Sequence, residues 1–396
     1  MSEAILNLHI TDLSRGGAGV ARDTSGRVIF VPYSLPGDEV RVQIIDAHKR
    51  FAQGLLLEVV KSSKDRVNPP CAVFGKCGGC QWQHVPYSLQ WKTKVSGVQQ
   101  ALARVQVRLS EISEYPAQKV WEYRNRVQLR GQFVEDAQGG RTELGFFARG
   151  SHDLIAAERC EISRPEINQG WGETRRQAQS LDRSEPFKVE VEVLSAPFPG
   201  GPAELRRTWN SAHGAAGFRQ VNDEQNEQLK GWIRSTFEPW NGSELYDLFG
   251  GAGNLSLQFQ DSMSMIHCVD VSSPAQSPVG TPSHFRFYSS PASRWIVKQA
   301  NQASKNAKVT SEKTSRLAIL DPPREGLSDS FEEIAVSLEK LGVDRLIAVG
   351  CDPDSWAKDV SRFQSRGWIL RKTALFDFFP QTPHVESAGF LTLGDV

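Results

Sequence analysis

From about residue 244 onward, short apolar stretches alternate with helical stretches along the chain. The apolar stretches fall at residues 245–249, 265–271, 317–320 and 345–350. This alternation predicts a doubly wound, mostly parallel α/β sheet, because parallel strands need a crossover connection between them. Ligand sites in such a sheet lie at the carboxyl ends of the strands, so the residues that follow each apolar stretch are the first candidates for a site.

The first sixty residues have a different pattern, in which short strands are separated by glycine and proline turns. Strands are predicted at 4–10, 27–31, 39–44 and 54–60, with turns at Gly16-Gly17-Ala18-Gly19 and Leu35-Pro36-Gly37-Asp38. This spacing predicts a small β-barrel of the oligonucleotide-binding kind. A β-rich interaction module with no particular partner fits the spacing equally well.

The middle of the chain mixes both patterns. We expect a helix at residues 88–104, a β-rich stretch at 121–194 and a second helix at 222–233. A chain of 396 residues is long enough for two or three domains. We therefore predict an N-terminal barrel at 1–66, a central α+β domain at 67–240 and a C-terminal α/β domain at 241–396.

Charge and hydropathy define the class of protein. The 46 Lys and Arg residues balance 46 Asp and Glu, so the chain average does not indicate nucleic acid. Residues 71–134, however, hold nine Lys or Arg against three Glu, which is either a solvated basic face or a polyanion-binding surface. The chain has no apolar run of the ~18 residues that a membrane span needs and no secretory signal pattern. We expect a cytoplasmic, monomeric protein that does not bind a membrane.

Three of the six cysteines, Cys71, Cys77 and Cys80, fall within ten residues of one another. Cytoplasmic cysteines are reduced, and thiolates at this spacing are typical ligands of zinc or of an iron–sulfur cluster. Either group takes four ligands, and Cys160 in the adjacent β-rich stretch is the natural fourth. The spacing leaves the choice between zinc and a cluster open.

Four polar or glycine-rich motifs follow the predicted strands of the C-terminal region. The glycine-rich stretch 246–254 is predicted to join a strand to a helix, and Asp270, Asp321-Pro322-Pro323-Arg324 and Cys351 end later strands. The glycines allow the backbone to approach a ligand closely. Asp270 is either a ligand of a ribose or a turn residue. A cysteine at the end of a strand, such as Cys351, is placed to act as a nucleophile. Glu386 is a candidate base in the same cleft, and His384 is a structural hydrogen-bonder.

Taken in order, these motifs resemble the RNA uracil-5-methyltransferases, especially the iron–sulfur branch that methylates 23S ribosomal RNA. The resemblance implies an N-terminal TRAM barrel that binds RNA, a central domain with a 4Fe–4S cluster on Cys71, Cys77, Cys80 and Cys160, and a Rossmann-like methyltransferase domain. It also implies that S-adenosylmethionine is the cofactor. The implied cofactor-binding residues are Gln220 (in the stretch Phe218-Arg219-Gln220-Val221-Asn222), Phe249, Gly251, Gly253, Asn254, Asp270 and Asp321.

The resemblance also implies a covalent mechanism. Cys351 would add to carbon 6 of uracil, Asp321 would lie between cofactor and target base, and Glu386 would remove the proton from carbon 5. Because the nucleophile is a thiolate, we expect the surroundings of Cys351 to lower its pKa from the usual ~8.5. The target base must first leave its stack, which favours RNA loops as substrates.

The chain departs from the family pattern at Gly250, Asp352 and Asp270, where cysteine, asparagine and often glutamate are usual. Residues 272–282 contain three prolines and a glycine, so we expect no ordinary helix there, and Ser289-Ser290 occupy the place of an acidic adenine-binding residue. These departures keep a catalytically weak RNA-binding protein open as an alternative. A tRNA substrate is a further alternative, as is a radical S-adenosylmethionine enzyme, although the wide gap from Cys71 to Cys77 and the fourth cysteine argue against the latter.

Overall fold

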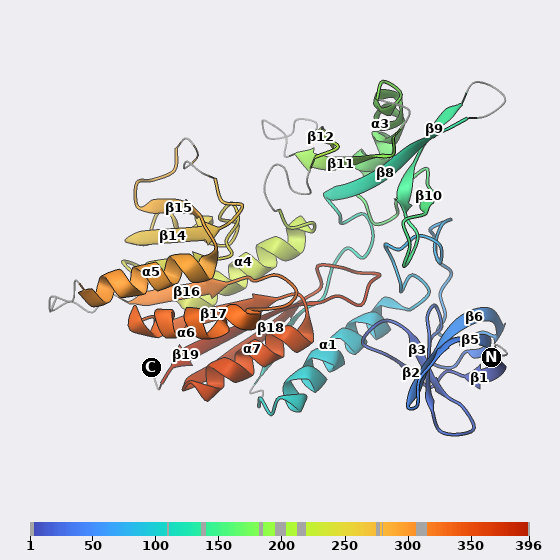
Figure 1. Cartoon of the computed structure of the whole chain (residues 1–396), viewed down its shortest axis with the longest axis horizontal. Coiled ribbons are helices and arrows are strands. Elements are labelled where there is room, and N and C mark those ends of the chain that lie inside the picture. The colour runs from blue at the N-terminus through green and yellow to red at the C-terminus, as the bar shows by residue number, and fades with distance from the viewer. Residues whose placement is uncertain are drawn as a thin grey trace.

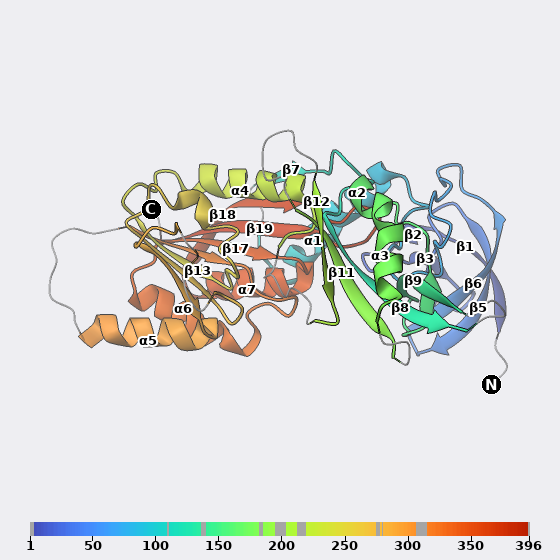
Figure 2. The same ribbon diagram turned by 90° about the horizontal axis from the view of Figure 1, so that it is seen from above.

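The computed structural model describes residues 4–108, 111–135, 140–181, 185–194, 203–211, 219–274, 278, 280–305 and 315–394. Within these residues the chain forms three β-sheets, one after another along the sequence (Figure 1). Seen from above, the N-terminal sheet lies at one end of the molecule and the C-terminal sheet at the other, with the central sheet between them (Figure 2).

The N-terminal sheet has six strands in the order β1-β5-β6-β4-β3-β2 around a core of its own. All four predicted strands are present, and two short strands, β2 and β3, flank the glycine turn. Gly19 starts β3, where a Cβ atom would lie 2.2 Å from Ser34 Oγ, so no larger residue fits. The strand bounds are Ile5–His9 (β1), Asp12–Leu13 (β2), Gly19–Arg22 (β3), Val28–Val31 (β4), Glu39–Ala47 (β5) and Phe51–Lys61 (β6).

The central sheet is antiparallel, with the order β10-β9-β8-β11-β12. Its helices, α2 (Pro165–Gln169) and α3 (Trp171–Ala178), share a core with every second residue of β8 and β11. Since side chains alternate across a strand, the polar residues between them point to the opposite face. The strands are Arg126–Val134 (β8), Arg141–Phe147 (β9), Leu154–Ala156 (β10), Phe187–Leu194 (β11) and Glu204–Trp209 (β12).

The C-terminal sheet has eight strands in the order β15-β14-β13-β16-β17-β19-β18-β7. The five strands from β15 to β17 are parallel to one another, as the apolar pattern predicts. Strand β19 runs antiparallel between β17 and β18. The bounds are Ile112–Tyr115 (β7), Glu244–Leu248 (β13), Met265–Asp270 (β14), Phe285–Ser289 (β15), Arg316–Leu320 (β16), Arg345–Gly350 (β17), Trp368–Phe376 (β18) and Glu386–Leu393 (β19).

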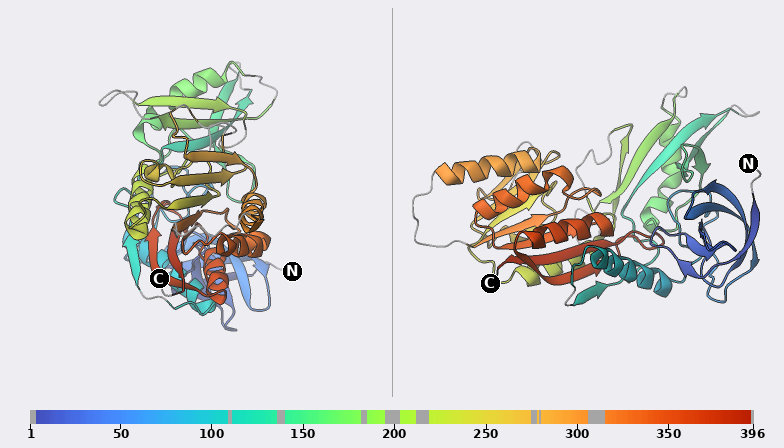
Figure 3. Two further views of the ribbon diagram at one scale, coloured as in Figure 1. Left: turned by 90° about the vertical axis from the view of Figure 1, so that its left-hand side faces the viewer. Right: turned by 60° about the horizontal axis from the view of Figure 1, so that its bottom comes forward.

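Helices cover both faces of this sheet, which confirms the doubly wound arrangement. Helix α4 (Asp223–Phe237) lies on one face, and α5 (Ala292–Lys305), α6 (Phe331–Lys340) and α7 (Pro353–Ser365) lie on the other (Figure 3, left). The predicted helix α1 (Tyr87–Arg104) packs beside α7, and β7 extends the edge of the same sheet. Both elements come from the middle of the chain, so the C-terminal core includes residues far outside its own sequence segment.

One prediction about this sheet is wrong. No α-helix follows the glycine-rich stretch after β13; a turn leads only to a 3-10 helix at Leu257–Phe259. The backbone conformation is the reason, because Phe249, Gly251 and Gly253 have positive φ angles of 64°, 56° and 84°, and each such residue interrupts a right-handed helix. A second 3-10 helix, Ser328–Ser330, precedes α6.

The proline-rich segment after β14 behaves as expected. Its described residues, 272–274, 278 and 280–282, contain no helix, and residues 275–277 and 279 lie outside the described part of the chain. None of the helices in the described ranges has the length and apolar character that crossing a bilayer requires.

The N-terminal sheet is attached to the helices that lead into the C-terminal core. Arg15, in the turn between β2 and β3, forms an ion pair with Asp354 at the start of α7. Arg104 of α1 pairs with the same carboxylate at 2.5 Å, and Trp82 donates from Nε1 to the carbonyl of Gly17 at 3.0 Å. These contacts place the glycine turn of the N-terminal sheet next to the first residues of α7.

Helix α1 also holds the chain that connects β18 to β19. Lys94 and Asp377 are fully buried and their side chains lie 2.6 Å apart, while Tyr87 donates to the second carboxylate oxygen at 3.0 Å. One turn earlier than Lys94, Gln90 accepts from the backbone N–H of Gln381 at 2.9 Å and donates to its side-chain oxygen at 3.0 Å. The buried charge is therefore compensated from both elements, and the connection is fixed to α1.

Replacing Lys94 by Ala should lower the free energy of unfolding by about 3–5 kcal/mol, because it leaves the Asp377 carboxylate buried and unpaired. Urea unfolding measures the change. Lys92→Ala is the matched control, since Lys92 is exposed on the same helix and should change stability by less than about 0.5 kcal/mol. Equal losses in the two variants would contradict this role of the buried pair.

Candidate active site

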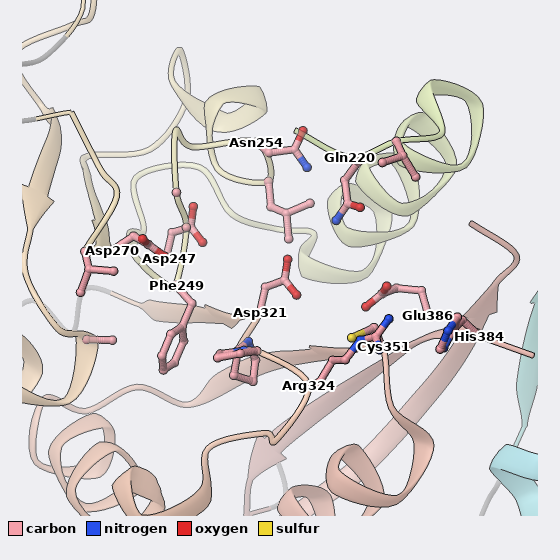
Figure 4. Close-up of a pocket in the computed structure, with 18 of the residues that line it drawn as sticks. Gln220, Asp247, Phe249, Asn254, Asp270, Asp321, Arg324, Cys351, His384 and Glu386 are labelled. Atoms are coloured by element: carbon pink, nitrogen blue, oxygen red, sulfur yellow. The ribbon is translucent and has the colours of Figure 1, made fainter. Parts of the chain in front are cut away.

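The carboxyl ends of β13, β14, β16 and β17 meet at one edge of the C-terminal sheet and border a cavity of about 780 Å³. Almost every residue that the sequence marks as a candidate lines this cavity, although these residues come from widely separated positions (Figure 4). The lining candidates are Gln220, Phe249, Gly251, Asn254, Asp270, Asp321, Cys351, His384 and Glu386. Gly253 is the exception, because it shapes the turn from behind the cavity wall.

Cys351 and Glu386 lie on the same side of the cavity because of the direction of β19. Cys351 follows the last residue of β17, and Glu386 is the first residue of β19. Since β19 is antiparallel to β17, with Gly350 opposite Ser387, the end of one strand lies beside the start of the other. Asp321 follows β16, the next strand, and lies between these two residues and the glycine turn (Figure 4).

Asp352 fixes the backbone directly after Cys351. Its side chain caps α7 by accepting hydrogen bonds from the N–H groups of Asp354 and Ser355, both at 3.0 Å. Asn and Asp are about equally good at the N-cap position. The departure from the usual asparagine therefore keeps the turn that presents Cys351.

On the opposite side, the glycine turn brings the backbone close to the cavity. Phe249 is held at a φ of 64°, a left-handed conformation that costs free energy in any residue but glycine and that is frequent at binding sites. At Gly250 a Cβ atom would lie 2.5 Å from Asp247 Oδ2 and 2.8 Å from Cys268 Sγ. The sulfur of Cys268 and this carboxylate thus occupy the space that the family's usual cysteine would need at position 250.

Hydrogen bonds from neighbouring elements hold the amide residues of the cavity. Asn125 Nδ2 donates to the carbonyl of Gln220 at 2.9 Å, and the backbone N–H of Asn125 donates to the carbonyl of Val221 at 2.9 Å. The side chains of Asn254 and Asn226 exchange two hydrogen bonds of 3.0 and 2.8 Å, which ties the glycine turn to α4. Phe218, the first residue of the expected cofactor-binding stretch, lies outside the described residues.

Burial favours the uncharged forms of three ionisable groups that line the cavity. Burial raises the pKa of Asp321 to about 7, with further contributions from the carboxylates of Asp247 and Asp270. Burial, followed by the negative charge of Asp321, raises the pKa of Glu386 well above its usual value. Burial lowers the pKa of His384 to about 4, so this imidazole is neutral at physiological pH.

The expectation that the surroundings lower the pKa of Cys351 is wrong for the structure without ligands. Burial and the neighbouring Glu386 carboxylate raise this pKa to about 12, and Arg324 opposes them only in part. The physical reason is that Cys351 is partly buried beside the carboxyl groups of Glu386 and Asp321, and both burial and a nearby negative charge disfavour the thiolate.

Three residues that border the cavity were not identified from the sequence as part of a site. Arg124 and Arg126 come from the central part of the chain, where Arg126 is the first residue of β8, and both line the cavity. Asp247, within β13, is fully buried, and Ser256 donates a hydrogen bond to one of its oxygens while the other has no partner in the described structure. The only signal for Asp247 is a carboxylate inside an apolar strand, which is costly and therefore rare.

The four clustered cysteines line a second, smaller cavity of about 60 Å³. Cys71, Cys77 and Cys80, from one loop, and the distant Cys160 all line this cavity. Arg124 lines this cavity as well as the large one, so the two are neighbours. Within the described ranges, no group of three or more His, Cys, Asp and Glu side chains is arranged to hold one metal ion.

Asp247→Asn should flatten the pH dependence of stability. Burial raises the pKa of Asp247 in the folded chain to about 7, so its contribution to stability is complete below the unfolded value of ~3.9 and is lost as the pH rises to 7. Asparagine stays neutral and loses nothing over this range. Urea unfolding at several pH values between 4 and 8 measures the effect, with the exposed Asp261→Asn as control. Parallel curves for wild type and Asp247→Asn would contradict the raised pKa.

Comparisons with known proteins match both ends of the chain to families. Residues 4–57 match the TRAM domain, and residues 302–393 match the family described as tRNA (Uracil-5-)-methyltransferase. The chain is 28% identical to a 23S rRNA (uracil(1939)-C(5))-methyltransferase of Chromohalobacter salexigens, over 97% of this chain and 89% of that protein. It is also 28% identical to an uncharacterised RNA methyltransferase of Thermosynechococcus vestitus, over 98% of both chains.

The fold has a counterpart among solved structures. A tRNA (uracil-54, C5)-methyltransferase of Pyrococcus abyssi, in complex with S-adenosyl-L-homocysteine, superposes with a TM-score of 0.66 at 17% identity and covers 98% of this chain and 99% of that one. The match spans all three sheets. The chain therefore has a TRAM domain at one end and a domain of the tRNA (Uracil-5-)-methyltransferase family at the other, and it is similar to RNA methyltransferases over nearly its whole length.

Proposed function

We propose that this protein uses S-adenosylmethionine to methylate carbon 5 of one uridine in RNA, and that the RNA is 23S rRNA. The observation that carries the proposal is the single cavity that joins a cysteine, two carboxyl groups and a glycine turn, with Asp321 between its two halves (Figure 4). Relatives named as 23S rRNA methyltransferases support the choice of RNA. The Pyrococcus abyssi structure is named for tRNA, so tRNA is the alternative substrate.

The cavity has room for a cofactor and a flipped base. Its volume, about 780 Å³, is in the upper part of the range for small-molecule sites. On one side, Phe249, Gly251 and Asn254 offer an apolar ring, exposed backbone and an amide, and Asp270 offers a carboxylate that suits ribose hydroxyls. The other side, with Cys351 and Glu386, is left for the uracil. This donor set fits a nucleoside-type cofactor, which supports S-adenosylmethionine.

The proposed reaction assigns one step to each side chain. When bound, S-adenosylmethionine would supply an electrophilic methyl carbon and a positive sulfonium charge. Cys351 loses its thiol proton to solvent, and its Sγ forms a bond to carbon 6 of uracil. The electron pair of the carbon 5–carbon 6 double bond then moves into the enolate, so that carbon 5 becomes nucleophilic. After methyl transfer, Glu386 takes the proton from carbon 5, and the electron pair left behind restores the double bond and expels Cys351.

The electrostatics of the cavity favour this order of events. Without ligands, burial and neighbouring carboxyl groups raise the pKa values of Cys351, Asp321 and Glu386, so the nucleophile is held as an unreactive thiol. A positive charge beside Asp321 would lower all three pKa values and so favour the thiolate. A carboxylate with a raised pKa is also a stronger base, which suits the removal of a proton from carbon 5 by Glu386. Cys351 would thus become reactive only when the site is filled.

Cys351→Ala should lower methyl transfer to RNA by about 10⁴-fold or more, because no other group in the cavity can replace the sulfur. Glu386→Gln should still form the covalent bond but release it slowly, so a protein–RNA adduct should accumulate. Transfer of a labelled methyl group to unmodified rRNA and denaturing gels measure the two effects.

Glu333→Gln serves as control, since this glutamate is exposed on α6. Full activity of Cys351→Ala would refute the covalent mechanism. Binding of RNA without binding of S-adenosylmethionine, measured by calorimetry on the wild-type protein, would instead favour the catalytically weak RNA-binding protein.

We further propose that Cys71, Cys77, Cys80 and Cys160 hold a 4Fe–4S cluster. The support for this proposal is that all four cysteines line one small cavity, and that cysteine thiolates are the usual ligands of such a cluster. The same loop supports the proposed active site, because the N–H groups of Gln81 and Trp82 both donate to the carbonyl of Gln381 at 3.0 Å. The role of these cysteines would be to fix the loop.

Cys80→Ser should remove the visible absorbance of the cluster together with most of the iron and acid-labile sulfide, because Cys80 is the buried member of the set. The measurement is metal and sulfide analysis of protein purified without air. Cys268→Ala is the control, as Cys268 is buried elsewhere. Wild-type protein with zinc and no sulfide would show that the site is a zinc site.

A further inference from the structure

A third cavity, of about 320 Å³, opens on the central sheet and has no part in the site described above. Its lining includes Arg130 of β8, Phe147 of β9, Lys188 of β11, and His152 and Asn210 from loops. The described lining residues include no Asp or Glu. The cavity thus combines fixed positive charge with an aromatic ring and has a volume that suits a single nucleotide.

The two positive side chains of this cavity are cross-strand neighbours. Arg130 and Lys188 are directly opposite in the register of β8 and β11. Like charges in this position destabilise a sheet. In the described part of the chain, no carboxylate forms an ion pair with either side chain; Arg130 is held by Gln128 at 2.8 Å and lies over the Phe147 ring at 4.6 Å. Within the described residues, no carboxylate therefore offsets the repulsion between the two cations.

At the other end of β8 and β11, near the active-site cavity, positive and negative side chains do pair. Glu192, opposite Arg126, pairs with Arg206 and Arg219, and Glu190 lies 3.8 Å from Arg126. Cation and carboxylate therefore alternate near the active site, but only cations remain at Arg130 and Lys188. The end of β8 and β11 that lies away from the active-site cavity therefore carries only positive side chains on this face, which indicates an anionic ligand.

The backbone around Lys188 is held in a fixed position. Asn210 has a φ of 50°, and it accepts from the Lys188 N–H through Oδ1 at 3.0 Å and donates from its own N–H to the Lys188 carbonyl at 2.9 Å. These two hydrogen bonds fix the backbone of Lys188, and so they fix the position from which its side chain extends. On the other side, His152 packs against the edge of Phe147 with ring centroids 5.0 Å apart.

Strand β8 connects this cavity to the active site. Arg126 lines the active-site cavity, and Arg130 lies four residues further along the same face of the strand. At ~3.3 Å per residue the two positions are about 13 Å apart, which equals the rise of about four stacked nucleotides at ~3.4 Å each. A strand of RNA whose target base enters the active site can therefore reach the cavity.

We propose that this cavity binds one nucleotide of the RNA substrate, a few positions from the target uridine, with its phosphate on Arg130 and Lys188. The inference rests on the proposed function, because it assumes that RNA is the substrate. The phosphate would cancel the repulsion between the two cations, and the cavity beside Phe147 would receive the rest of the nucleotide. The contact adds affinity and sets the register of the RNA, but it takes no part in methyl transfer.

The test is the double variant Arg130→Gln/Lys188→Gln, compared with Lys298→Gln/Lys340→Gln, which removes two exposed charges from α5 and α6. With an rRNA fragment that carries the target, the double variant should bind roughly tenfold more weakly. Its plot of log K against log salt concentration should be less steep by about 0.7, the slope of one lost phosphate contact on a single strand. The rate at saturating RNA and the affinity for S-adenosylmethionine should equal those of wild type, and urea unfolding should show no loss of stability.

A truncation series of the RNA locates the contact. The difference between the double variant and wild type should vanish once the nucleotide that occupies the cavity is removed from the fragment. If wild type methylates RNA and the double variant binds every fragment like wild type, or if the control variant loses as much affinity, the inference is wrong and the proposed function stands. If wild type neither binds nor methylates RNA, the proposed function itself fails.

Discussion

The buried pair of Lys94 and Asp377 is the contact on which the arrangement of the active site depends. It joins α1 to the connection between β18 and β19, and that connection leads directly into Glu386. Desolvation lowers the pKa of Lys94 while the charge of Asp377 opposes this, so each charge is stable only in the presence of the other. With Gln90 and the cysteine loop, the pair fixes a connection that would otherwise be a long surface loop beside the catalytic cavity.

Burial of ionisable groups in the active-site cavity affects the reactivity of Cys351. Burial and the neighbouring carboxyl groups raise the pKa values of both Cys351 and Glu386. A free thiolate in an RNA-binding protein would be open to oxidation. Under the proposed mechanism, a thiolate that forms only beside the bound cofactor would be protected from this oxidation. The ion pair of Arg15 and Asp354 places the N-terminal sheet beside the start of α7, which follows Cys351.

Much of the fold could be read from the chain because strand and helix patterns are local. The strands at 245–249 and 345–350 and the helix at 88–104 were predicted within a few residues. The missing helix after the glycine turn was not, because it depends on the left-handed backbone at Phe249, which no side-chain pattern reveals. The raised pKa of Cys351 was not predicted either, since it follows from carboxyl groups that are adjacent in space but come from different strands.

The sequence by itself determined which chemical groups are available: a cysteine after one strand, Asp321 after another, a glycine turn, and four cysteines at the spacing of a cluster site. These features are local, because they depend on a few neighbouring residues and on where an apolar stretch ends. Only the tertiary structure decided that β19 runs antiparallel to β17, which brings Glu386 beside Cys351, and that Arg130 faces Lys188. Strand direction and register are set by packing between distant segments, so they cannot be read from either segment alone.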